Sequence, residues 1–270
     1  MSTNPFSKLL DLQVQALKTG ASAAKEPYRD RTSDEDLPFR TEGYGGFGGD
    51  DYFDTEGEPE DPVILSHGLA RGADDMDGLA HHLLENGYTG SEVYAIEYGD
   101  PMPSLEDGAE QLHSFIRSVR DHTGEEPAVV GHSNGGLIPR YMMDRYGDED
   151  VEKLVAVSSP NHGSIWSDIW TAAGTDQNQI SRRSAREGVL SELNDKDLDT
   201  EIYTVRGTHD GSYLDPESPA LEDALNVKVR GGHDIQSHEA VLKILEADGP
   251  EKAVESLEKM EEVLEAEGKP

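Results

Sequence analysis

The sequence predicts an α/β fold: a doubly wound, mostly parallel sheet flanked by helices, with an N-terminal helix and linker in front of it. Two observations predict this class. From residue 62 onward, short apolar runs of strand length alternate with longer segments whose apolar residues recur at helical spacing. In addition, the residues from Gly131 to Gly135 read G-x-S-x-G and stand directly between one such run and one such segment. A strand that turns at once into a helix has this pattern.

The apolar runs place the strands and helices in chain order. A strand, a loop and a helix in succession form one unit of a parallel sheet, and the unit repeats along the chain. The expected strands are residues 63–65, 93–96, 128–130, 154–157, 202–205 and 227–229. The expected helices are residues 76–84, 105–119 and 137–143, followed by a highly charged helix at 250–267. In such a sheet, functional residues gather beyond the carboxyl ends of the strands.

The sequence divides into three parts. Residues 1–60 are expected to form an amphipathic helix, over 4–25, and an acidic, glycine-rich linker. Residues 61–248 are expected to form the α/β domain, and residues 249–270 the charged C-terminal helix. This helix carries no chemistry and is expected to pack on one side by a narrow apolar stripe of Val254, Leu257 and Leu264. Within the domain, residues 161–200 interrupt the alternation and contain both tryptophans. This insertion is predicted either as a lid or pocket wall or as an ordinary crossover helix.

Charge is the most unusual property of the chain. Aspartate and glutamate number 56 and lysine and arginine 23, which gives a formal net charge of −33. Such self-repulsion destabilises a compact fold in dilute buffer, whereas molar salt reduces the Debye length to about 3 Å. The composition therefore resembles that of halophilic proteins, with an ordinary acidic protein as the alternative. Nucleic acid is excluded as a partner, because phosphate binding requires clustered lysine and arginine.

Location and partners follow from what the sequence lacks. No run of about 18 apolar residues occurs, so no transmembrane segment is expected. The first residues lack the basic and then apolar stretches of a signal peptide, and we predict a cytoplasmic location in a high-salt cytoplasm. The chain has no cysteine and hence no disulfide. The N-terminal helix either packs on the domain or makes a peripheral contact with a partner or a hydrophobic particle.

The G-x-S-x-G sequence predicts a serine nucleophile. The abrupt turn forces its central residue, Ser133, into a strained backbone conformation, and the flanking glycines keep neighbouring side chains from clashing. Ser133 then stands at the carboxyl end of a strand and at the N-terminus of a helix, where free N–H groups favour negative charge. The alternative is a glycine-rich turn whose serine only caps the helix.

A serine nucleophile needs a base and a carboxylate that orients the base. After a turn of this kind they follow in the order Ser, Asp or Glu, His. Asp210 lies in the loop after the fifth expected strand, and His233 in the loop after the sixth. We therefore assign Ser133 as nucleophile, His233 as general base and then acid, and Asp210 as the orienting carboxylate. Asp215 and His238 are the alternatives. They are less favoured, because both lie further from the strand ends.

Other residues are expected to line the site. The backbone N–H groups of Leu69 and Asn134 are the expected oxyanion donors. Trp166, Trp170 and His162 are candidates for the substrate pocket, with a loop histidine that has only local partners as the alternative for His162. No metal site and no cofactor are expected, because the chain contains neither an H-x-x-x-H pair nor cysteine.

Three further histidines are given structural roles. His132 stands beside the nucleophile, cannot reach its hydroxyl as a base, and is expected to pack beneath the sheet edge. His67 is expected to brace the loop after the first strand by hydrogen bonding. His209 could line the site, but a loop histidine with a local partner is the favoured interpretation.

Five motifs together resemble those of α/β-hydrolases of the lipase and esterase type, and are similar to those of small bacterial triacylglycerol lipases. They are His67-Gly68-Leu69, Gly131-His-Ser-Asn-Gly-Gly136, Ser158-Ser-Pro-Asn-His-Gly163, Asp210-Gly211 and Gly232-His233. The resemblance covers residues 62–248. It implies hydrolysis of carboxylic esters through an acyl-enzyme, with the same triad and the same oxyanion donors. Asn134 stands where many lipases carry an apolar residue.

Three functions are compared. The leading hypothesis is a serine carboxylic-ester hydrolase, an esterase or lipase, that works in high salt on a small ester or lipid. The second is an intracellular polyester or thioester hydrolase associated with a hydrophobic particle. The third is a non-catalytic member of the fold that binds an acyl ligand, against which the complete set of Ser133, Asp210 and His233 argues. Reactions with a carboxylate nucleophile are disfavoured, because the turn carries serine.

Overall fold

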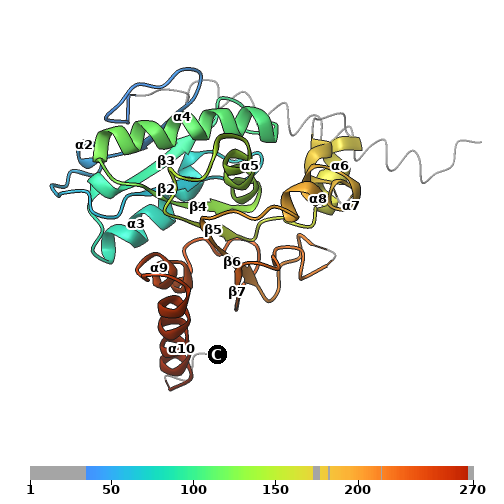
Figure 1. The fold of residues 1–270 in the computed structure, drawn as a ribbon. Helices are drawn as coiled ribbons and strands as arrows, with labels where there is room; N and C mark the ends of the chain where they lie inside the picture. Colours follow the sequence, from blue (N-terminus) through green and yellow to red (C-terminus); the bar gives the residue numbers. More distant parts are fainter. Residues whose placement is uncertain (1–34, 173–176, 182, 214, 267–270) are drawn as a thin grey trace, which may run out of the picture.

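A seven-stranded sheet forms the centre of the computed structural model, which describes residues 35–172, 177–181, 183–213 and 215–266. The strand order is β1-β3-β2-β4-β5-β6-β7. Strands β2 to β7 are parallel (Figure 1). Strand β1 pairs antiparallel with β3. The strands are β1 (Gly45–Gly48), β2 (Val63–Ser66), β3 (Val93–Glu97), β4 (Ala128–His132), β5 (Lys153–Val157), β6 (Glu201–Gly207) and β7 (Leu225–Val229).

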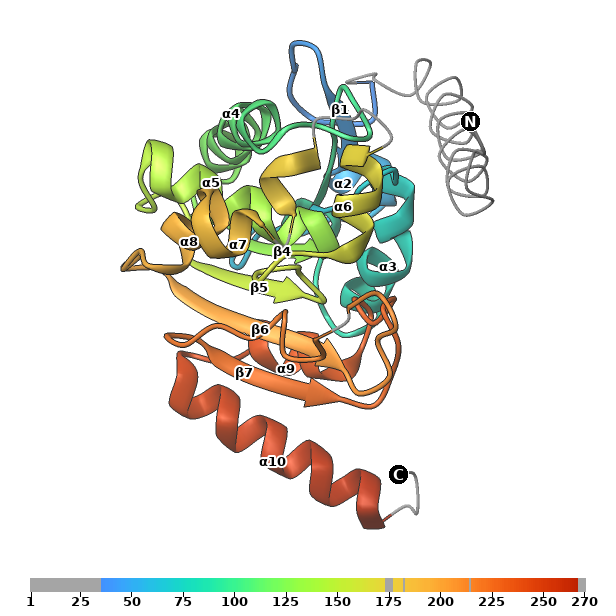
Figure 2. The same cartoon turned by 90° about the vertical axis from the view of Figure 1, so that its right-hand side faces the viewer.

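Helices pack on both faces of the sheet (Figure 2). Helices α3, α9 and α10 contribute buried side chains to one face, and α4, α5 and α8 to the other. The doubly wound architecture that the sequence predicts is therefore confirmed. The helices are α2 (Asp50–Phe53), α3 (Asp77–Glu85), α4 (Leu105–Thr123), α5 (Leu137–Tyr146), α6 (Ile165–Ala172), α7 (Ser184–Glu187), α8 (Val189–Asn194), α9 (Glu239–Leu245) and α10 (Pro250–Ala266).

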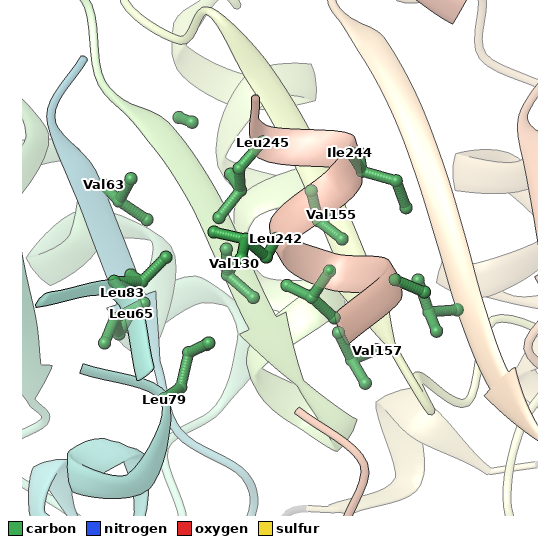
Figure 3. Close-up of a cluster of buried hydrophobic side chains, with 14 of the residues drawn as sticks. Val63, Leu65, Leu79, Leu83, Val130, Val155, Val157, Leu242, Ile244 and Leu245 are labelled. Atoms are coloured by element: carbon green, nitrogen blue, oxygen red, sulfur yellow. The ribbon is translucent and has the colours of Figure 1, made fainter. Parts of the chain in front are cut away.

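Alternate residues of each central strand pack into opposite layers of the core. Val63, Leu65 and Val130 belong to the cluster that includes Leu242 of α9 (Figure 3), whereas Ile64 belongs to the cluster on the other face. Because both faces are covered, these strands carry continuous apolar runs and no polar alternation. This explains why apolar runs located β2 to β5, each within a few residues of its ends. The edge strand β7 is partly exposed and alternates apolar and polar residues instead.

The C-terminal helix packs on the domain through a narrow stripe of buried side chains. This stripe differs in one residue from the apolar stripe that the sequence predicts. Ala253 and Leu257 of α10 are buried, whereas Val254, which we expected on the buried side, is 38% exposed. The expected N-terminal helix at 4–25 lies outside the described residues.

The prediction of a glycine-rich linker before the domain was wrong at its centre, because residues 45–48 form an edge strand of the sheet. Gly46 adopts φ +150°, and a Cβ built on it would lie 2.1 Å from the carbonyl oxygen of Ala95 on β3. Only glycine permits this approach. Tyr44 and Phe47 supply the apolar burial and are 5% and 6% exposed. The sheet therefore begins ahead of the domain boundary that composition indicated.

We expect Gly46→Ala to destabilise the fold. Its Cβ would meet the Ala95 carbonyl on a backbone that L residues rarely adopt, so the free energy of unfolding should fall by at least about 2 kcal/mol. Gly211→Ala is the matched control, because its Cβ would meet no atom within 4 Å. It should change stability by less than about 0.5 kcal/mol. Urea denaturation followed by circular dichroism measures both, and equal effects would contradict this account of β1.

Candidate active site

Three loops meet at the carboxyl edge of the sheet. β4 ends at His132, and a 3-10 turn, Ser133–Gly136, leads directly into α5. Asp210 follows β6, and His233 follows β7. Because these strands run parallel in one sheet, their following loops open at the same edge. The structure thus gathers Ser133, Asp210 and His233 there.

The turn after β4 is strained and tightly enclosed. Ser133 adopts φ +55°, in the left-handed region that non-glycine residues rarely occupy. A Cβ on Gly131 would lie 2.1 Å from the carbonyl oxygen of Gly135. A Cβ on Gly135 would lie 2.3 Å from the carbonyl oxygen of Ser66. The glycines at both positions are therefore required by backbone contacts, as expected of a sharp strand-to-helix turn.

The imidazole of His233 is hydrogen-bonded to a buried carboxylate. Nδ1 of His233 lies 2.9 Å from Oδ2 of Asp210, whose side chain is 4% exposed. The backbone N–H of Ser212 donates to Oδ1 of Asp210 at 2.9 Å. Burial by itself would raise the pKa of Asp210, but the interactions with His233 and Ser212 outweigh it, so the pKa lies below its ordinary value. The ionised carboxylate fixes the ring and leaves Nε2 for another partner.

Ser133 and His233 share the wall of one cavity, which has a volume of about 230 Å³. Leu69 and Asn134 line the same cavity. Asn134 is the second residue of the 3-10 turn, where an N–H has no helical acceptor. The N–H of Leu69 has no hydrogen-bond partner in the part of the chain that the structure describes. Both expected oxyanion donors therefore belong to the wall that contains Ser133.

Tyr213 also lines the cavity, and the sequence analysis missed it. Its hydroxyl donates to the carbonyl oxygen of Ser158, and the side chain of Ser133 lowers the pKa of the phenol. Its ring centroid lies 5.8 Å from that of His233. Burial and the charge of Asp210 raise the pKa of the phenol well above its ordinary value. No local pattern marks this tyrosine, because its role depends on contact with residues distant in sequence.

Two buried histidines hold the surrounding loops. Nε2 of His132 lies 3.1 Å from the backbone oxygen of His233. Nδ1 of His67 lies 2.9 Å from the carbonyl oxygen of Gly68, and Nε2 accepts the N–H of Tyr98 at 3.4 Å. Burial lowers the pKa of each histidine to about 4, so both rings are neutral at pH 7. The bracing role predicted for His67 and the buried position predicted for His132 are both found.

The alternative triad residues have other partners. His238 is the N-cap of α9, where Nδ1 accepts the N–H of Ala240 at 3.1 Å. Oδ1 of Asp215 accepts the N–H of Glu217 at 3.0 Å. The exposed His209 contacts the hydroxyl of the adjacent threonine at 2.8 Å. His233 bonded to Asp210 is therefore the pair that the geometry favours.

Of the three predicted pocket residues in the insertion, the structure describes the side chain of His162. His162 is exposed, and its Nδ1 lies 3.1 Å from the carbonyl oxygen of Ser218. This contact fits the alternative of a loop histidine with its own partner. The side chains of Trp166 and Trp170 lie outside the described part of the structure.

The insertion nevertheless forms one wall of the cavity. Ser164, Ser167 and Ile180 of this segment line it. A larger hollow, of about 780 Å³, lies within the insertion and between its helices, but it contains no residue of the candidate triad. The candidate site lies at the smaller cavity, because Ser133 and His233 of the candidate triad line it.

A buried arginine joins the helix after the nucleophile to the insertion. Arg140 of α5 is 3% exposed and donates to Oδ1 of Asn161 at 2.9 Å and to the carbonyl of Leu193 and Oδ1 of Asn194 at 3.0 Å. Asn161 in turn donates to the carbonyl of Pro219 at 2.7 Å. Burial lowers the pKa of Arg140 to about 10, which still leaves it charged at pH 7. We call this set the arginine hub; it ties three segments together around the site.

Within the described ranges, no group of three or more histidine, cysteine, aspartate or glutamate side chains is arranged to hold a metal ion. The same residues include no helix with the length and apolarity needed to cross a membrane.

Comparisons of sequence match the chain to lipases and thioesterases. The family model for class 2 lipases matches residues 60–181. A lysosomal thioesterase PPT2 homolog of Drosophila melanogaster and the human lysosomal thioesterase PPT2 are 29% and 28% identical to this chain, each over 105 residues. These matches cover 38% of this chain and 36% and 34% of the two relatives, so the chain aligns with about a third of their length.

Solved structures share the fold over a larger part of the chain. The mature lipase BlEst2 of Bacillus licheniformis has a TM-score of 0.59 at 18% identity and covers 76% of this chain and 99% of its own. A thioesterase domain from the curacin biosynthetic pathway has a TM-score of 0.51 at 17% identity and covers 72% and 94%. At such identities the likeness concerns the fold alone.

Asp210→Asn tests the carboxylate and histidine pair. A carboxylate whose folded-state pKa is lowered adds stability that is present above its ordinary pKa of 3.8 and is lost as the pH falls through the folded-state value. We expect the wild type to be more stable than the variant at pH 7, and the difference to shrink below about pH 4. Thermal unfolding of both proteins, from pH 7 to below about pH 4, measures this difference in stability. The exposed Asp215→Asn is the control, and a difference independent of pH would contradict the assignment.

Proposed function

Because the chain is an α/β-hydrolase of the lipase and esterase type, we propose that it hydrolyses carboxylic esters through an acyl-enzyme on Ser133. The observation that carries the proposal is the hydrogen bond between His233 and buried Asp210. His233 also lines the same cavity as Ser133, whose backbone is strained. These are the groups that serine hydrolysis requires. The cavity also lies where parallel sheets bind their ligands, beyond the carboxyl ends of the strands.

The reaction has two halves that use the same three side chains. Nε2 of His233 takes the proton of the Ser133 hydroxyl as Oγ attacks the ester carbonyl carbon. The imidazolium, stabilised by Asp210, then gives this proton to the leaving alcohol as the C–O bond breaks, and an acyl-serine remains. Water repeats the sequence: His233 takes its proton, the hydroxide adds to the acyl carbon, and the proton returns to Oγ as the acid leaves.

Charge develops on the carbonyl oxygen in both halves. The N–H groups of Leu69 and Asn134 are the proposed donors, because both residues line the cavity beside the nucleophile. One such donor contributes a factor of about 10² to 10³ to kcat in other hydrolases. The hydroxyl of Tyr213, which is bonded to the carbonyl of Ser158 and interacts with the side chain of Ser133, would help to position the nucleophile.

Thioester hydrolysis is the second candidate, because matched relatives are lysosomal thioesterases. The triad serves both reactions, since a thiol replaces the alcohol as leaving group. The ratio of kcat/KM for an oxygen ester and a thioester of the same acid decides between them. A ratio well below one would move the assignment to a thioesterase.

The acidic composition supports the proposal that the enzyme works in high salt. The net charge of −33 is spread over the chain and creates repulsion that dissolved ions screen. We include this condition in the design of each assay.

Ser133→Ala should abolish hydrolysis of p-nitrophenyl esters. Loss of a serine nucleophile lowers kcat by about 10⁴-fold or more. Ser118→Ala, on α4 and not in the cavity wall, is the matched control and should retain wild-type kcat. Release of p-nitrophenol in molar KCl, with acyl chains of increasing length, measures both variants. Equal activity of wild type and Ser133→Ala would exclude the proposed nucleophile, and folded but inactive wild type would favour the non-catalytic acyl-binding protein.

Potassium chloride should raise the melting temperature, with most of the rise below about 1 M, where the Debye length falls from about 10 Å to 3 Å. An uncharged osmolyte at equal osmolality should raise it less, because it screens no charge. Differential scanning fluorimetry compares the two series, with esterase activity as a second readout. Full stability and activity at about 0.1 M salt would contradict the proposed salt requirement.

A further inference from the structure

The loop that contains His233 leaves the sheet at its edge. β7 is the last strand of the sheet and is partly exposed (Figure 2). Gly231 and Gly232 stand between this strand and His233, and glycine restricts the backbone less than any other residue. The hydrogen bond with Asp210 orients the imidazole, but it acts on the side chain alone. The distance from this base to Ser133 therefore depends on what holds the backbone of His233.

His132 provides a hydrogen bond to that backbone. It is the last residue of β4, directly before Ser133, and is 1% exposed. Its Nε2 lies 3.1 Å from the carbonyl oxygen of His233, and the two ring centroids lie 4.9 Å apart. The N–H of Ile235, in the same loop, also donates to this oxygen at 3.1 Å. In the described ranges, the bond from His132 is thus the one that ties the backbone of His233 to another part of the fold.

The acceptor determines which nitrogen of His132 carries the proton. A carbonyl oxygen only accepts, so Nε2 is the donor, and Nδ1 of the neutral ring has no proton. Oδ1 of Asp234 lies 3.9 Å from Nε2, which is too far for a hydrogen bond. Nδ1 is buried without a hydrogen-bond partner among the described residues. A second proton on this nitrogen would therefore add a buried charge that no acceptor stabilises.

A neutral ring is suited to a place beside the base. Burial and the charge of His233 lower the pKa of His132 to about 4, so the ring is neutral at pH 7. During the proposed reaction His233 becomes an imidazolium, and a second cation with its centroid 4.9 Å away would oppose that charge. A neutral N–H donor holds the carbonyl without this repulsion.

We propose that His132 is a positioning residue, whose Nε2–H donates to the carbonyl of His233 and so holds the base beside the nucleophile's turn. The inference rests on the proposed esterase function and adds one side chain to its machinery. His132 and Ser133 are consecutive, so a single hydrogen bond and a single peptide unit connect the base to the nucleophile. Misplacement of a reacting group by about 1 Å can lower a rate by about 10²-fold.

His132→Leu and His132→Gln separate positioning from packing. Leucine fills the buried space but has no donor, whereas the side-chain amide of glutamine can donate to the same carbonyl. We expect His132→Leu to lower kcat for p-nitrophenyl butyrate by about 10-fold or more, with KM changed by less than about threefold. His132→Gln should keep kcat within about threefold of wild type. A role in packing alone predicts the reverse order, because leucine is the better apolar filler.

The assays use the full chain in molar KCl. His113→Leu is the matched control, since this histidine of α4 stacks on Tyr146 at 4.5 Å and does not line the cavity. It should retain the kcat and KM of the wild type. Circular dichroism measures the folded fraction of each variant, and kcat is expressed per folded protein.

A second measurement needs neither a variant nor activity. NMR of the protein labelled with ¹⁵N-histidine distinguishes the two neutral tautomers of each ring. Burial lowers the pKa of both His67 and His132 to about 4, so these rings should protonate last as the pH falls. His67 donates from Nδ1 to the carbonyl of Gly68, and its Nε2 accepts the N–H of Tyr98. We therefore expect one ring with its proton on Nδ1 and the other, His132, with its proton on Nε2.

The outcomes separate this inference from the function on which it rests. Wild-type kcat in His132→Leu, or a glutamine variant as slow as the leucine variant, would overturn the positioning role and leave the esterase standing. Two late-protonating rings that both carry the proton on Nδ1 would overturn the hydrogen bond itself. Absence of hydrolysis by the wild type with every ester and thioester would overturn the proposed function, and the role of His132 in it.

Discussion

The turn from β4 into α5 is held between the loops that follow β2 and β5, at distances that exclude side chains. A Cβ on Gly135 would lie 2.3 Å from the carbonyl oxygen of Ser66, and one on Gly136 would lie 1.9 Å from Oγ of Ser159. The turn therefore cannot relax, and the strained conformation of Ser133 is fixed by its neighbours. The same close packing brings Leu69 into the cavity wall beside the nucleophile. Every other group of the site is positioned relative to this turn.

The parts of the fold that depend on local pattern could be predicted from the sequence. The central strands are buried on both faces, so their apolar runs identify them without any knowledge of their neighbours. Strand β1 could not be found this way, because Gly45–Gly48 contains a single side chain, that of Phe47. Its backbone pairing with β3 makes it a strand, and a composition rich in glycine conceals that pairing. Val254 was predicted to be buried but is exposed. Helical spacing shows that a helix has an apolar stripe, but it does not show which residues at the edge of the stripe pack against the domain.

Some residues of the candidate site could be predicted from the sequence and others could not. Asp210 and His233 could be found because they follow strands in a known order, and topology brings such loops together. Tyr213 and Arg140 could not, since their roles depend on hydrogen bonds to residues that lie far away in the chain. The sequence left two roles open for His162, and the structure gives its ring a partner in a different loop. Long-range contacts of single side chains are thus what the sequence does not reveal.

The hydrogen bonds of the arginine hub depend less on the ionic strength of the medium than exposed ion pairs do. Arg140 donates to carbonyl and amide oxygens, which carry no net charge. An exposed ion pair weakens as dissolved ions screen it, whereas buried hydrogen bonds lie beyond the reach of those ions. The acidic surface and the interior therefore respond differently to the same solvent. A change in the salinity of the medium therefore acts mainly on the acidic surface, and much less on the hydrogen bonds between α5 and the insertion.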